Sequence, residues 1–150
     1  MKTNQTKALD KLWSEKVKEL AEEARRRGMK DVADGLIILH GVCGRPRDMK
    51  DLEWDRVDLE LGMVYLERKA TNKKKATYGK YEEHAVVTRE AQKILESRKT
   101  RRTKDERVLP GWNAGWAREI VKATAKRMGW NEKLKWDGPH VLRHGVGRRS

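Results

Sequence analysis

Several features that define other classes of protein are missing from this sequence of 150 residues. A single cysteine, Cys43, excludes an internal disulfide and any zinc cluster built on cysteine. No apolar run approaches the roughly 20 residues of a membrane-spanning helix, and the first residues lack the apolar stretch of a signal peptide. No dinucleotide fingerprint, Walker loop or cluster of His and carboxylate ligands is present. These absences favour an intracellular protein (cytoplasm or nucleoid, or nucleus in a eukaryote) with no metal, no other cofactor and no membrane partner.

Acidic residues are also scarce, and this shortage is the first positive signal. The chain carries 36 Lys and Arg against 23 Asp and Glu, which gives a formal net charge of +13 and a pI near 10.0. So large a positive charge on one small domain is typical of a protein that binds a polyanion, usually nucleic acid. A basic protein that is merely soluble is the alternative. We expect residues 1–150 to form a single domain, because neither a clear linker nor an internal repeat interrupts them.

Hydrophobic periodicity and capping residues predict a mainly helical chain. Apolar residues at helical spacing predict helices over 7–27 and 31–43, and the second is apolar enough to be the central core helix. Pro46 fits the first turn of a short helix that Gly44 separates from the one before it. Two further helices are predicted, one with Thr88 as its N-cap and one running from an Asn113 N-cap to Met128. The six tryptophans are interpreted as core residues, and Trp116 is placed on the apolar face of the last helix.

An alternating pattern predicts antiparallel strands over residues 63–67 and 82–87. The fold class is therefore α+β, mainly α, with a small antiparallel sheet of about three strands at the edge of the helical core. Residues 68–80 between the strands form a long basic hairpin tip, which is suited to reach a DNA groove and contact the backbone. A solvated loop is the alternative. A second basic run, residues 98–104, is interpreted as an exposed connection, and residues 108–111 as a buried turn.

Arg45 is the first candidate for a functional residue. It stands at the junction before the helix that Pro46 begins, close to free backbone N–H groups, and helix N-termini attract phosphate. Asp48 follows three residues later and can reach back to orient the guanidinium.

His140 and Arg143 are the second candidates. If Pro139 begins a helix, their spacing of three residues puts both side chains on one face. A cation beside an imidazole suits binding a phosphate and moving protons next to it. Ordinary surface charge is the alternative.

Four segments, taken in order, resemble the catalytic domain of the tyrosine recombinases, which include the phage integrases. Arg45 begins a segment similar to the family's first-arginine box, in which Asp48 replaces the usual Glu and is followed by Leu52, Trp54, Asp55 and Val57. Lys69, 24 residues later, occupies the family's position for a catalytic lysine at the start of a hairpin turn. Residues 108–110 resemble an apolar-Pro step before the next helix. Residues 139–144, Pro-His-Val-Leu-Arg-His, resemble the His-x-Leu-Arg-His box. The resemblance covers roughly residues 6 to 150.

The resemblance implies a reaction and a role for each residue. A tyrosine attacks a DNA phosphodiester, which gives a 3′-phosphotyrosine and a free 5′-hydroxyl. Arg45 and Arg143 would stabilise the charge on the transition state, Lys69 would protonate the leaving oxygen, His140 would assist proton transfer or hold the phosphate, and Asp48 would support Arg45. Lys73, Lys74 and Lys75 are alternatives for the role of Lys69. Further DNA contacts are expected from Arg47, Lys73, Lys74, Lys75, Lys80 and His144.

The departures from the family pattern shape the expected activity. The family's nucleophilic tyrosine follows the His-x-x-Arg box by some tens of residues, whereas the tyrosines here are Tyr65, Tyr78 and Tyr81, all in or near the hairpin. The resemblance therefore implies a partial catalytic domain, without its nucleophile and without the N-terminal DNA-clamping domain. Such a fragment would bind double-stranded DNA and other recombinase protomers on that DNA, and would be a monomer without it. A non-catalytic basic DNA- or RNA-binding module is the alternative function.

Overall fold

The computed structural model describes residues 4–67, 81–102, 104–132 and 134–142, with side chains described from residue 13 onward. The fold is mainly helical with one three-stranded antiparallel sheet, which confirms the predicted fold class. The five α-helices of the described residues are α1 (Asn4–Arg26), α2 (Lys30–Val42), α3 (Pro46–Asp51), α4 (Arg89–Thr100) and α5 (Ala114–Met128). Short 3-10 helices cover Trp54–Arg56 (η1) and Pro139–Leu142 (η3). None of the described helices is long and apolar enough to cross a membrane.

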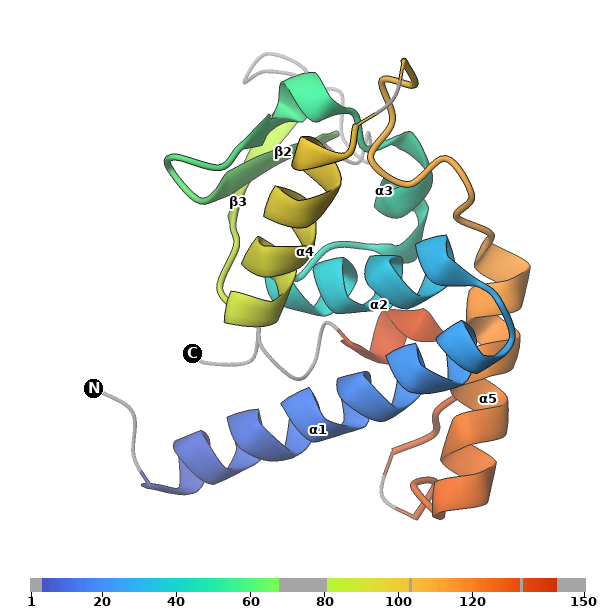
Figure 1. Cartoon of the computed structure of the whole chain (residues 1–150). Coiled ribbons are helices and arrows are strands. Elements are labelled where there is room, and N and C mark those ends of the chain that lie inside the picture. Colours follow the sequence, from blue (N-terminus) through green and yellow to red (C-terminus); the bar gives the residue numbers. More distant parts are fainter. Residues whose placement is uncertain (1–3, 68–80, 103, 133, 143–150) are drawn as a thin grey trace, which may run out of the picture.

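Helix α2 lies at the centre of the molecule, as its apolar sequence predicts. Residues 32–42 are all buried. Figure 1 shows α1, α4, α5 and η3 arranged around α2, with the sheet beyond α4. The side chains of Leu36, Ile38 and Leu39 are fully buried in a contiguous core to which every described α-helix contributes. Helix α2 is therefore the central core helix that the sequence predicts.

The sheet has the order β1-β2-β3, formed by Val57–Asp58, Met63–Glu67 and Tyr81–Ala85. The bounds of β2 are those predicted from its alternation, while β3 begins and ends earlier than predicted. Every pair of strands is antiparallel, and Val64 faces His84 across the second pair. Val64 and Leu66 are buried on one face of β2, so the sheet packs that face against the helical core. The hairpin tip that the sequence predicts at 68–80 lies outside the described residues.

The end of α2 differs from the sequence prediction, which assigned the break to Gly44. Cys43 ends the helix in the left-handed region with φ 54°, and its backbone N–H donates to the Leu39 carbonyl. The space at Gly44 is limited, because a Cβ there would lie 3.2 Å from Leu66 Cδ1 and 3.3 Å from Val42 Cγ2. Cys43 itself is only partly buried.

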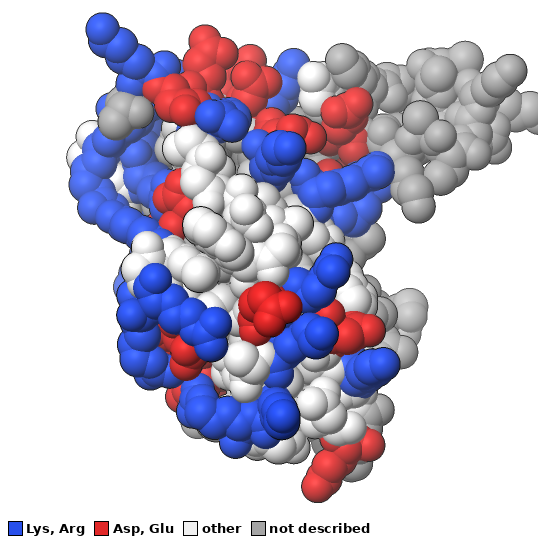
Figure 2. Space-filling view, turned by 90° about the vertical axis from the view of Figure 1, so that its right-hand side faces the viewer, with Lys and Arg blue, Asp and Glu red and all other residues white. Residues whose placement is uncertain are grey.

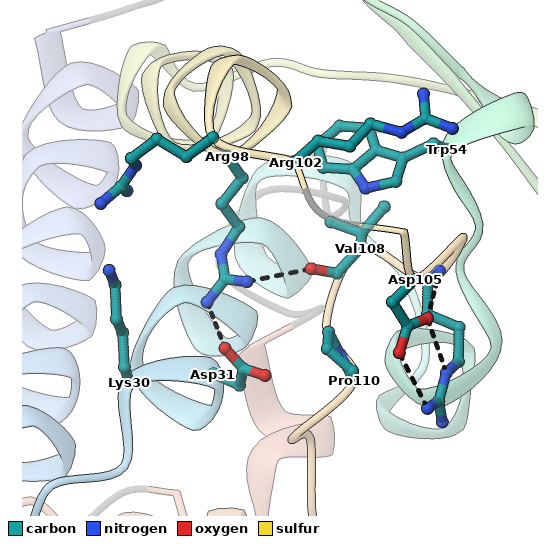
Figure 3. Close-up of a pocket in the computed structure, with 10 residues that line it drawn as sticks. Lys30, Asp31, Trp54, Arg98, Arg102, Asp105, Val108 and Pro110 are labelled. Carbon is teal, nitrogen blue, oxygen red and sulfur yellow. Dashed lines mark hydrogen bonds and ion pairs between the residues drawn. The ribbon is translucent and has the colours of Figure 1, made fainter.

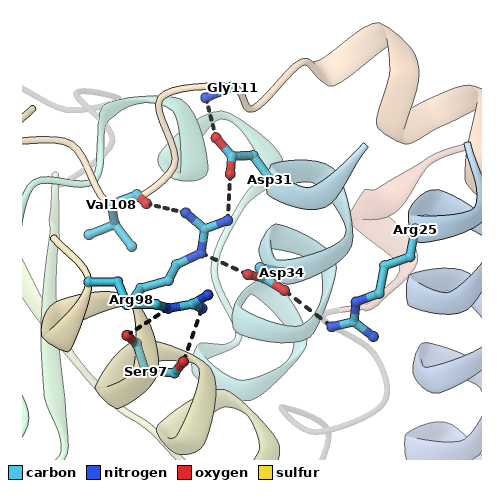
Figure 4. Close-up of polar contacts among 8 residues, drawn as sticks. Arg25, Asp31, Asp34, Ser97, Arg98, Val108 and Gly111 are labelled. Carbon is cyan, nitrogen blue, oxygen red and sulfur yellow. Dashed lines mark hydrogen bonds and ion pairs between the residues drawn. The ribbon is translucent and has the colours of Figure 1, made fainter. Parts of the chain in front are cut away.

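The prediction that residues 98–104 form an exposed connection is wrong for its first residues. Helix α4 continues to Thr100, and the Arg98 side chain is only 12% exposed. Its guanidinium donates to Asp34 Oδ2 at 2.8 Å, to the Val108 carbonyl at 3.0 Å and to Asp31 (Figure 4). Asp34 also accepts from Arg25 at 3.2 Å. This network joins α1, α2 and α4 to the segment after α4, and a basic run read by composition alone does not reveal it.

The tryptophans are core residues with one clear exception. Trp136 is buried and lies between Trp13 and Trp130, with ring centroids 5.1 and 4.9 Å away. The Lys16 ammonium lies 5.3 Å from the Trp136 centroid, so a cation–π contact helps hold α1 against residues 130–136. Trp116, by contrast, is 51% exposed, because the core face of α5 is formed by its neighbours Ala117, Ile120 and Val121. Its placement on the apolar face of that helix was wrong. The predicted turn at 108–111 is buried only at Val108 and Leu109.

Candidate functional site

Arg45 is held by two neighbours, Asp48 and Glu67, at the start of α3. It is the N-cap residue of that helix, with Pro46 in the first turn as predicted. Asp48 is buried, and its Oδ2 accepts from the Arg45 backbone N–H at 2.8 Å and from Nε at 3.3 Å. A terminal nitrogen of the guanidinium also donates to the Glu67 carbonyl at the end of β2, at 2.6 Å. The contact expected between Asp48 and Arg45 is therefore present, and it fixes the direction of a side chain that is 17% exposed.

A histidine and a glutamate on β3 complete the surroundings of Arg45, and sequence reasoning missed both. His84 Nδ1 lies 2.8 Å from the Val42 carbonyl at the end of α2, and its Nε2 lies 3.0 Å from Glu82 Oε1. The same Oε1 lies 4.0 Å from the Arg45 guanidinium. Both partners of the imidazole, a backbone carbonyl and a carboxylate oxygen, are acceptors. The period-two spacing of Glu82 and His84 placed them on one face of the strand, but no local signal pointed that face at Arg45.

His140 is the one member of the His140–Arg143 pair that the structure describes. Pro139 is the first residue of η3, and residues 139–142 form a 3-10 helix. The His140 side chain is 57% exposed, and its Nε2 lies 3.1 Å from Asp137 Oδ1. Its neighbours Val141 and Leu142 are buried, so η3 is anchored by apolar residues while His140 faces outward.

Helix α2 adjoins both candidate segments near its C-terminal end. The buried ring of His40, two residues before the end of α2, lies with Nδ1 3.4 Å from the Leu142 carbonyl. His40 is therefore a packed, hydrogen-bonded residue. Arg45 follows the end of that same helix after a short turn. The segments that contain Arg45 and His140, 95 residues apart in sequence, thus both adjoin the C-terminal half of α2, the second of them through Leu142.

Several predicted site residues cannot be placed against this framework. Arg47 is described and is exposed on α3. The remaining ones lie outside the described residues, and they are Lys69, Lys73, Lys74, Lys75, Lys80, Arg143 and His144. Their roles stay predictions.

The two described tyrosines belong to the sheet. Tyr65 is in β2 opposite Glu83, and Tyr81 is the first residue of β3. The Tyr81 hydroxyl accepts from Arg56 at 2.8 Å, and the Arg56 guanidinium carbon lies 3.9 Å from the ring centroid. Tyr78 lies outside the described residues.

Basic side chains spread over much of the surface. Figure 2 shows Lys and Arg at the upper left and across the lower part of one face, with uncharged side chains between them and acidic ones near the top, at the centre and at the lower edge. Among the residues that the structure describes, no group of three or more His, Cys, Asp and Glu is arranged to hold a metal ion. The chemistry that the described site offers is therefore that of fixed cations beside an imidazole, which suits an anionic ligand.

These features define a class of fold, a helical core built around one buried helix with a small antiparallel sheet at its edge. No family model matches the sequence, and no curated protein matches it closely enough to be called a relative. Among solved structures, the chain is similar to one described as the crystal structure of XerA recombinase, with a TM-score of 0.52 at 19% sequence identity. The match covers 87% of this chain and 46% of the XerA chain, so the present sequence spans less than half of that protein. At this identity the similarity concerns the fold.

Proposed function

We propose that this chain is part of a DNA strand-transferase of the tyrosine recombinase type, and that its residues 1–150 bind duplex DNA. The observation that carries the proposal is the attachment of Arg45 and the His140 segment to the same half of α2, within a fold similar to that of XerA recombinase. The net charge of +13 supports a polyanionic ligand. A basic module that binds DNA or RNA without catalysis is the alternative, and it would not depend on Arg45.

In this proposal the cations act on a single phosphodiester. Arg45 enters the site with its direction already set by Asp48 and the Glu67 carbonyl, so it loses little freedom when it binds a non-bridging oxygen. Arg143 would bind the second non-bridging oxygen and His140 would hold the phosphate or assist proton transfer. A tyrosine hydroxyl would attack phosphorus and lose its proton, the bond to the 5′-oxygen would break, and Lys69 would protonate that oxygen. We expect neither Tyr65 nor Tyr81 to be that nucleophile, because both lie in the sheet.

The test of this proposal is the salt dependence of binding to a labelled duplex of about two helical turns, followed by fluorescence anisotropy. We expect affinity to fall steeply as salt rises, with a log–log slope of about −0.9 for each phosphate contacted. Arg45→Ala should weaken binding by about tenfold, the loss of one charge-assisted contact of roughly 1.5 kcal/mol, and Arg45→Lys should restore part of it. Arg26→Ala is the matched control, because Arg26 is exposed, already paired with Glu23 and located beyond the opposite end of α2.

Three results would count against the proposal. Equal losses in Arg45→Ala and Arg26→Ala would show that binding depends on overall charge and would favour the non-catalytic module. A covalent DNA adduct mapped to Tyr65, Tyr78 or Tyr81 would contradict the assignment of the site. Preference for structured RNA over duplex DNA would favour the RNA-binding alternative.

A further inference from the structure

A second basic site lies at the other end of α2, away from Arg45. A cavity of about 210 Å³ is bordered by the start of α2, the end of α4 and residues 105–110 (Figure 3). The Trp54 indole forms part of its wall, and Arg98 lies within it. Five basic residues line this cavity but only two acidic ones, and the basic ones are Lys30, Arg98, Arg101, Arg102 and Arg107.

Both carboxylates of the cavity are already engaged by other groups. Asp31 accepts from Arg98 and from the backbone N–H of Gly111. Asp105 accepts from the backbone N–H of Arg107 at 2.9 Å and from its guanidinium at 3.2 and 3.3 Å. Hydrogen bonds from Arg107 lower the pKa of the Asp105 carboxyl, so it stays ionised at neutral pH and bound to that arginine. Two of the five cations are thereby neutralised.

The other three cations have no carboxylate partner among the described residues. Arg101 donates to the hydroxyl and carbonyl of Ser97, which carry no net charge. Lys30 and Arg102 are exposed and make no ion pair with any described residue. Figure 3 shows Lys30 on one side of Arg98 and Arg102 on the other, beside Trp54. Three unneutralised positive charges around one concave site repel one another, and an anion bound between them would relieve that repulsion.

We propose that this cavity binds a phosphate group, and that its natural source is the backbone of the DNA bound at Arg45. Planar guanidiniums and a mobile ammonium match the oxygens of a phosphate, and the ordered Arg98 keeps the cavity floor rigid. The cavity is at the start of α2 and Arg45 is just after its end. Helix α2 between them has 13 residues, a helix length of about 20 Å, which matches the rise of roughly six base pairs at about 3.4 Å each. This source rests on the proposed function, whereas a free phosphate compound would use the same chemistry without it.

The test compares Lys30→Gln/Arg102→Gln with Lys18→Gln/Lys93→Gln, which removes the same two charges from exposed positions outside the cavity. Duplexes of about 8 and 20 base pairs are titrated across a salt series. The long duplex can reach both sites, while the short one has little length to spare beyond the separation of the two sites. For the long duplex, we expect the cavity variant to bind about five- to tenfold more weakly. The slope of the log association constant against log salt concentration should be smaller in magnitude by roughly one. Both changes should be smaller for the short duplex. The control should lose no more than about twofold.

The second part of the test measures the melting temperature of each variant in inorganic phosphate and in pyrophosphate. The reference for each is a chloride solution of the same ionic strength. If pyrophosphate raises the melting temperature of the unaltered chain and not of the cavity variant, the source is a free phosphate compound and the site itself is supported. If only the duplex distinguishes the variants, the source is the DNA backbone. Equal behaviour of the cavity variant and its control in both arms would overturn the proposal. If the unaltered chain binds no duplex, the proposed function fails, and the pyrophosphate arm alone decides the cavity.

Discussion

Replacing Arg98 with alanine is expected to lower the free energy of unfolding by about 3 kcal/mol. The substitution removes three hydrogen bonds and leaves the Asp34 carboxylate, only 5% exposed, without its closer partner. An uncompensated buried charge typically costs 3–5 kcal/mol, and we expect about the lower end because Arg25 still reaches Asp34 at 3.2 Å. Urea unfolding followed by circular dichroism measures the change.

The control for this variant is Arg107→Ala, which breaks an exposed pair with Asp105 and should change stability little. A double-mutant cycle with Asp34→Ala should give a coupling free energy of about 1–3 kcal/mol. If Arg98→Ala is no less stable than the Arg107 variant, the network in Figure 4 does not hold α2 and α4 together.

Replacing Gly41 with valine is expected to cost about 2–3 kcal/mol of unfolding free energy. A Cβ at this position would lie 2.3 Å from Ala91 Cβ and 2.6 Å from Thr88 Oγ1, so α2 and α4 approach each other here with no room for a side chain. Ala91 Cβ is attached directly to the backbone and cannot move aside without shifting α4. Gly41→Ala should cost less, since alanine regains about 1 kcal/mol of helix propensity.

Gly115→Ala provides the matched comparison within the first turn of α5. There a Cβ would meet only Asn113 Oδ1, at 3.2 Å, so the change in stability should stay within about 1 kcal/mol. Thermal and urea unfolding of the three variants would show the order. Wild-type stability in Gly41→Val would mean that α2 and α4 pack less closely than described.

Much of the fold could be predicted from the sequence because its signals are local. The Asn113 cap and Gly129 define α5 from residue 114 to residue 128, and the Asn113 side chain accepts from the Trp116 backbone N–H at 2.9 Å. Thr88 likewise caps α4 through Ala91. These signals depend on residues a few positions apart, so neither needed knowledge of the tertiary structure.

The contacts that could not be predicted are those between side chains on elements far apart in the sequence. Arg98 lies in a run of seven residues that contains five basic ones, and only the positions of Asp31 and Asp34 on α2 show that it is buried. Glu82 and His84 have no motif of their own, and their place beside Arg45 follows from the packing of β3 against the end of α2. The contact between Asp48 and Arg45 could be predicted from the sequence because the two are three residues apart, a distance that a capping contact spans.

The most direct test of the central claim is a crystal structure of the chain bound to duplex DNA, in which the contacts of each backbone phosphate are measured. We expect one phosphate to accept hydrogen bonds of about 2.7–2.9 Å from both Arg45 and Arg143, with His140 in reach of the same group. Arg45 and Arg143 on separate surfaces, more than about 15 Å apart and contacting different phosphates or none, would contradict the recombinase assignment. The chain would then be a basic nucleic-acid-binding module without this chemistry.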